Sequence, residues 1–78
     1  MKQRIRELLE PLLPIVDLDS EFLYSELDSL GIMTILMALS DEFKIPLNAK
    51  DATPKNFKSL DALAKMVEDK LAKDEGKA

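Results

Sequence analysis

Asp28, Ser29 and Leu30 place an acid and a hydroxyl directly before the most apolar stretch of the chain, and Gly31 follows them. A serine at the start of a helix is explained most simply as a cap, because its oxygen accepts a backbone amide bond worth about 1 kcal/mol. The alternative is a chemical role for the hydroxyl, which a junction between a loop and a helix leaves exposed. Spacing alone favours the cap.

Two other serines have to be separated from Ser29. No helix is expected after Ser20, whereas Ser59 precedes a clean helical pattern and is explained as the cap of the last helix. Ser29 is therefore the candidate for a chemical role.

The chain contains neither histidine nor cysteine. It therefore lacks the usual general base, the usual thiol nucleophile and the commonest metal ligand. Carboxylates could still catalyse a reaction, but 78 residues leave little room for a water-excluding cleft around them, so we do not expect an enzyme. The cysteine count also excludes disulfides and makes the cytoplasm the expected compartment.

The acidic residues are concentrated in one part of the chain. Residues 15–43 contain seven acids and no Lys or Arg, whereas the remainder contains eight acids and eleven bases. Such a segment repels nucleic acid and attracts a basic protein surface. The alternative is a solubilising face. The spacing of these acids matches no specific cation-binding loop, so we predict no metal site.

The length and the hydropathy pattern predict one all-α domain over residues 1–73, followed by a flexible tail at 74–78. No apolar run reaches 18 residues, so we expect no membrane span. The first helix should kink or end near Glu10, because Pro11 removes an amide and clashes one turn back. Residues 15–27 then form a long irregular connection, for which we expect three anchors: Phe22, Leu23 and Leu27.

The second half of the chain predicts three helical segments. The central one runs from Leu30 to Phe43 and is apolar nearly all round, so it is either central to the bundle or shows apolar surface to a partner. A one-turn helix is expected after Thr53, and the last helix follows Ser59.

The sequence resembles the acyl carrier protein family in three consecutive parts. These are Asp28-Ser29-Leu30, the apolar helix through Leu39, and the run Asp41-Glu42-Phe43-Lys44-Ile45-Pro46. The resemblance implies a four-helix bundle with a long first loop and a short third helix. It also implies that Ser29 receives a 4′-phosphopantetheine arm from coenzyme A and carries acyl groups as thioesters in fatty-acid, lipid or related secondary biosynthesis.

The resemblance further implies partners and site residues. The partners are a phosphopantetheinyl transferase, an acyl-loading ligase and acyl-processing or transferring enzymes, and the carrier itself is expected to be a monomer. The positions for recognition of the arm, the transferase and other partners are Asp28, Leu30, Gly31, Met33, Thr34, Met37, Asp41 and Glu42. The positions that would line an acyl pocket are Ile35, Leu36, Leu39, Phe43, Leu63 and Val67. Met33 and Met37 could equally be core residues.

The chain departs from typical fatty-acid carriers at two positions. Gly31 and Thr34 stand where those carriers have acids, which looks more like D-alanyl carriers and other stand-alone carriers that serve AMP-forming ligases. We hypothesise that the missing side chain of Gly31 lets the arm or a partner lie close to the first turn. Two alternatives remain: an unmodified helical interaction subunit with a carrier-like fold, and a small carboxylate enzyme.

Overall fold

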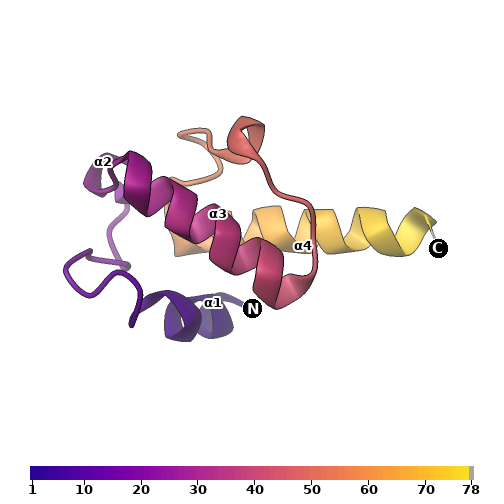
Figure 1. Cartoon of the computed structure of the whole chain (residues 1–78), viewed down its shortest axis with the longest axis horizontal. Helices are drawn as coiled ribbons and strands as arrows, with labels where there is room; N and C mark the ends of the chain where they lie inside the picture. The colour runs from indigo at the N-terminus through magenta and orange to yellow at the C-terminus, as the bar shows by residue number, and fades with distance from the viewer. Residues whose placement is uncertain (78) are drawn as a thin grey trace.

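The computed structural model describes residues 1–77, with side chains for residues 1–73. The elements, in chain order, are α1 (Lys2–Leu9), α2 (Leu23–Glu26), α3 (Ser29–Phe43), the 3-10 helix η1 (Ala49–Asp51) and α4 (Leu60–Lys77). Helices α1, α3 and α4 pack against one another, and α4 extends beyond the other elements at its C-terminal end (Figure 1). The predicted all-α bundle is confirmed, and no strand occurs within residues 1–77.

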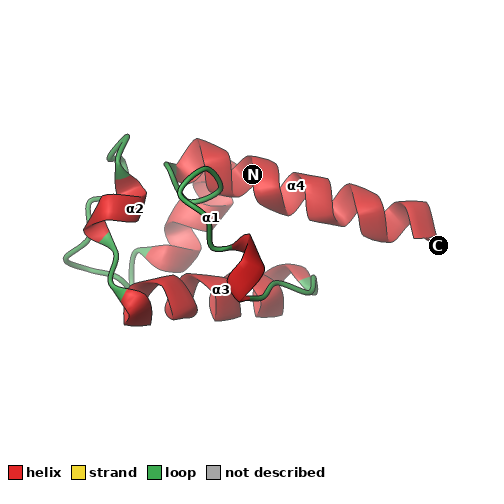
Figure 2. Cartoon of the chain, turned by 90° about the horizontal axis from the view of Figure 1, so that it is seen from above, coloured by secondary structure: helices red, strands yellow, loops and turns green. Residues whose placement is uncertain are grey.

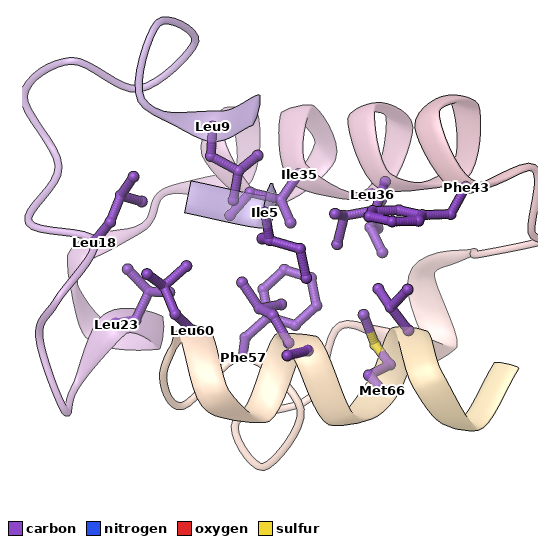
Figure 3. Close-up of a cluster of buried hydrophobic side chains, with 14 of the residues drawn as sticks. Ile5, Leu9, Leu18, Leu23, Ile35, Leu36, Phe43, Phe57, Leu60 and Met66 are labelled. Atoms are coloured by element: carbon purple, nitrogen blue, oxygen red, sulfur yellow. The ribbon is translucent and has the colours of Figure 1, made fainter. Parts of the chain in front are cut away.

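A single apolar core lies between α1, α3 and α4 (Figure 3). Each helix contributes side chains with no exposed surface, for example Ile5, Ile35 and Leu63. Burying an aliphatic side chain of this size stabilises the fold by about 1.5–3 kcal/mol. Phe57 is also fully buried, although it precedes α4 and lies outside the regular helices.

The first helix ends where the sequence predicts. Helix α1 stops at Leu9, and the chain continues through a turn in which the Leu12 and Leu13 amides both donate to the Leu9 carbonyl (3.0 and 2.9 Å). Pro11 lies within this turn and has no amide to donate.

The connection between α1 and α3 is more ordered than predicted. Residues 15–27 were expected to be irregular, but they contain the one-turn helix α2, whose Leu23 amide donates to the Lys58 carbonyl (2.9 Å). Of the three expected anchors, Leu23 is fully buried and Leu27 half-buried, whereas Phe22 is 70% exposed. The prediction for Phe22 was wrong, and the buried residue of this loop that it missed is Leu18.

The connection between α3 and α4 also differs from the prediction. Helix α3 ends at Phe43 as expected, with Lys44 in the left-handed conformation (φ 55°) and Pro46 two residues later. The short helix, however, is η1, capped by Asn48. The one-turn helix expected after Thr53 forms only a turn, although the Thr53 hydroxyl accepts the Asn56 amide (3.1 Å), as a cap would.

Helix α4 begins where the sequence predicts, because the Ser59 hydroxyl accepts the Ala62 amide (3.3 Å). The flexible tail expected at 74–78 involves Ala78 and side chains that lie outside the described residues, so it stays a prediction. Within the part of the chain that is described, no helix is long and apolar enough to cross a membrane.

Candidate functional site

The start of α3 is built by two extended residues that follow α2. Leu27 and Asp28 have extended backbones, which turn the chain from α2 into α3 at the end of the molecule that also holds the loop after α1 (Figure 2). The Asp28 carboxylate accepts the Gly31 amide at 2.7 Å, and its carbonyl accepts the Ile32 amide at 3.0 Å. Asp28 is therefore the N-cap of α3.

Ser29 occupies the first helical position after this cap. The interpretation of Ser29 as the cap was wrong, because the capping bond comes from the Asp28 side chain. Ser29 is solvent-exposed and lies at the end of α3 where the helix dipole is positive. Its hydroxyl is thus available for chemistry without the loss of a helix cap.

Gly31 is accounted for by contacts inside the chain. It is buried, and a Cβ atom built on it would lie 3.3 Å from Asp28 Oδ1 and 3.3 Å from Leu27 Cδ2. The missing side chain therefore gives room to the capping carboxylate and to Leu27. Our hypothesis that the missing side chain also lets the arm or a partner lie close to the first turn stays a prediction.

The apolar side chains of α3 divide into an inner and an outer set. Ile35 and Leu39 are fully buried, whereas Leu30, Met33 and Met37 are 75%, 51% and 67% exposed. The alternative in which the two methionines are core residues was therefore wrong. Thr34 is half-buried, and its hydroxyl donates to the Leu30 carbonyl at 2.8 Å.

Two acids of residues 15–43 are paired with arginines of α1. Glu42 accepts a hydrogen bond from Arg4 at 2.9 Å, so this predicted recognition acid is partly neutralised inside the chain, whereas Asp41 is exposed. Arg6 donates to Asp19 at 2.8 Å. This hydrogen bond holds the pKa of the Asp19 carboxyl below its usual range and raises the pKa of Arg6.

The six residues predicted to line an acyl pocket do come together, since all are buried members of the core. They form a packed interior in which Ile35, Leu39, Leu63 and Val67 expose no surface. One hollow, of about 410 Å³, lies between residues 12–16 and the start of α3 and touches none of the six. Another, beside Met33 and Met37, is lined in part by Leu36.

Acidic residues do not gather into a cation site in the part of the chain that is described. No group of three or more carboxylates there is placed to hold a metal ion.

The comparison with protein families decides what this chain is. The family model described as phosphopantetheine attachment site matches residues 2–67. The chain belongs to this family. Neither the curated proteins nor the solved structures gave a significant match.

Members of the phosphopantetheine attachment site family carry 4′-phosphopantetheine covalently, and this is the cofactor of the protein. The start of α3 fits such a group, because it offers an exposed hydroxyl at a helix N-terminus, which favours a phosphate. The Gly31 and Ile32 amides donate to Asp28, whereas those of Ser29 and Leu30 donate to no acceptor in the described part of the chain. They remain available to an anion.

Sequence reasoning missed two parts of this region. It did not identify Leu12 and Ile15, which lie in the loop beside α3 and are 48% and 96% exposed. Leu12 gave no signal, because it keeps the helical spacing from Ile5 and Leu9, whereas Ile15 follows Pro14 and lies beyond the first helix. It also missed the pairing of Glu42 with Arg4, for which a separation of 38 residues gives no local signal.

Proposed function

We propose that Ser29 is the attachment residue and that the protein carries acyl groups as thioesters on the arm. The observation that supports this most is the exposed Ser29 hydroxyl at the first position of α3, with the cap supplied by Asp28. Membership in the phosphopantetheine attachment site family supports the carrier function in general.

The chemistry of the chain supports the same proposal. A thioester needs a thiol, and the sequence contains no cysteine. The arm would supply that thiol, and the Ser29 and Leu30 amides would face its phosphate at the positive end of α3. The chain itself contributes position and recognition, and we propose no catalytic role for it.

Partner recognition would use the exposed side of α3. Met33 and Met37 suit a surface that has to contact several enzymes, because methionine side chains are flexible and polarisable. Asp41 would add electrostatic attraction for a basic transferase or ligase. We propose fatty-acid or related lipid biosynthesis in the cytoplasm as the setting, with the carrier acting as a monomer.

One experiment tests the attachment directly. The purified protein is incubated with coenzyme A and a broad-range phosphopantetheinyl transferase, and the intact mass is measured. We expect one arm per chain, no gain in Ser29→Ala, and an unchanged gain in the control Ser59→Ala. Loading that persists in Ser29→Ala would reject the assignment, and no loading of the unmodified sequence would favour the interaction subunit.

A further inference from the structure

A groove runs beside the attachment residue on the side of α3 that faces the loop after α1. Its volume is about 410 Å³, within the range of about 300–1,000 Å³ that is usual for small-molecule sites. The loop forms one wall, and the other consists of the end of α2 and the first turns of α3. The lining residues are Leu12, Leu13, Pro14, Ile15, Val16, Glu26, Leu27, Asp28, Leu30, Gly31 and Thr34.

The lining of this groove is mainly aliphatic, and part of it is open to water. Ile15 is 96% exposed, Leu30 75% and Leu12 48%, which is unusual for three large aliphatic side chains on one hollow. Covering them with an apolar group would be favourable, because it removes apolar surface from water. Of the polar side chains here, Thr34 has a hydrogen bond to the Leu30 carbonyl and needs no other partner.

The groove is continuous with the attachment residue. Asp28 and Leu30, the sequence neighbours of Ser29, both line it. A group tethered to Ser29 would therefore reach the groove as part of the same molecule, with a high effective concentration. The interior between α3 and α4 offers no comparable space, because Ile35 and Leu63 are fully buried and would have to move apart.

We propose that the groove between residues 12–16 and the start of α3 holds an uncharged aliphatic acyl chain carried on Ser29. This inference rests on the proposed function and adds where the cargo lies and what chemistry it has. The two acids at the groove, Glu26 and Asp28, are exposed and would repel a carboxylate at the far end of the chain. The groove therefore selects aliphatic chains without a negative end.

The test uses the full chain, loaded by the transferase from coenzyme A analogues in which a stable amide replaces the thioester to the acyl group. Loading is first verified by intact mass, which tests the proposed function separately. Thermal unfolding is then compared for arms that carry no acyl group, butyryl, octanoyl and dodecanoyl. We expect the melting temperature to rise with chain length by roughly 4–8 °C for the longest chain, the shift that about 1 kcal/mol of stabilisation gives in a domain of 60–100 residues.

Two variants test whether this rise in melting temperature comes from binding in the groove. Ile15→Ser removes an exposed groove residue, whereas Phe22→Ser removes a comparably exposed apolar residue of the same loop outside the groove. We expect Ile15→Ser to lose at least half of the rise and Phe22→Ser to keep it. Dodecanedioyl, which ends in a carboxylate, should give a smaller rise than dodecanoyl.

Amide chemical shifts give a second readout that needs no variant. On lengthening the acyl chain, the largest changes in amide chemical shift should occur at Leu12, Leu13, Ile15, Val16 and Leu30. Three results would reject binding in the groove without affecting the carrier function. They are verified loading with no length-dependent rise in melting temperature, a rise that Ile15→Ser leaves unchanged, and amide shift changes confined to Leu63 and Val67. Absence of loading would overturn both the groove and the carrier function.

Discussion

Ser29 and Ser59 both stand at the start of a helix, but the structure uses their hydroxyls differently. The Ser59 oxygen accepts the Ala62 amide and caps α4. At the start of α3 the capping bond is made by Asp28, one residue earlier, to the Gly31 amide. The difference of one position separates a serine that caps its helix from an exposed serine whose helix is capped by its neighbour.

The comparison of the two helix starts shows what the acid before Ser29 contributes. Asp28 stabilises the helix and fixes the direction in which α3 begins, so Ser29 itself carries no structural requirement. Gly31 belongs to the same arrangement, because its missing side chain leaves room for the Asp28 carboxylate.

We expect the largest difference between Ser29 and Ser59 when each serine is replaced by alanine. Ser29→Ala should abolish loading of the arm while changing the free energy of unfolding by less than about 0.5 kcal/mol, as for surface substitutions without a cap. Intact mass and urea denaturation measure the two quantities. A loss of stability as large as that of Ser59→Ala would show that Ser29 is a structural residue after all.

The next effect concerns the caps themselves. Asp28→Ala should lower the free energy of unfolding by about 1–2 kcal/mol, and Ser59→Ala by about 0.5–1 kcal/mol. The order follows from the hydrogen bonds, which are 2.7 Å for Asp28 and 3.3 Å for Ser59. Chemical denaturation checks it, with Ser25→Ala, a substitution of an exposed serine, as control; equal losses would remove the distinction between the two caps.

Gly31→Ala is expected to have a smaller effect. Alanine favours a helix over glycine by about 1 kcal/mol, but the new Cβ would lie 3.3 Å from Asp28 Oδ1 and disturb the cap. We therefore expect no net gain in stability. In the Asp28→Ala background the same substitution should be more favourable by about 0.5 kcal/mol or more, which a double-mutant cycle measures. Additive effects would show that cap and glycine are independent.

The smallest effect is expected from the pair between Asp19 and Arg6. Since folding lowers the Asp19 pKa, this carboxylate stabilises the fold above its unfolded pKa of about 3.9 and loses that contribution as the pH falls through its lower folded pKa. Asp19→Asn should therefore reduce stability slightly at pH 7 and converge with the unmodified protein at acid pH. Thermal unfolding between pH 2 and 7 checks this, with Asp17→Asn as control.

The sequence predicted the long elements well, because their signals are local. The boundaries of α3 follow from an apolar run closed by Lys44 and Pro46, and the Ser59 cap follows from the spacing of the apolar residues after it. The sequence prediction placed the cap at Ser29 and not at Asp28, and Asp and Ser are about equally good caps, so residue type does not show which of the two it is. Only the backbone geometry decides it.

The short elements could not be predicted for a different reason. Helix α2 is held by the bond from the Leu23 amide to the Lys58 carbonyl, which joins residues far apart in the chain. The Thr53 hydroxyl accepts the Asn56 amide, but the turn after it does not continue as the expected helix, and the short helix forms at Ala49–Asp51 instead. The open groove beside α3 likewise depends on how the loop after α1 packs, which has no local signal in the sequence.

The ion pair of Arg4 affects how the binding of a partner enzyme depends on ionic strength. The Arg4 guanidinium pairs with Glu42 and lies 4.7 Å from the centre of the Phe43 ring. Together with Arg6 on Asp19, it leaves five of the seven acids of residues 15–43 without an ion pair in the described part of the chain. The attraction of a cationic enzyme should thus fade less steeply with added salt than the formal charge suggests.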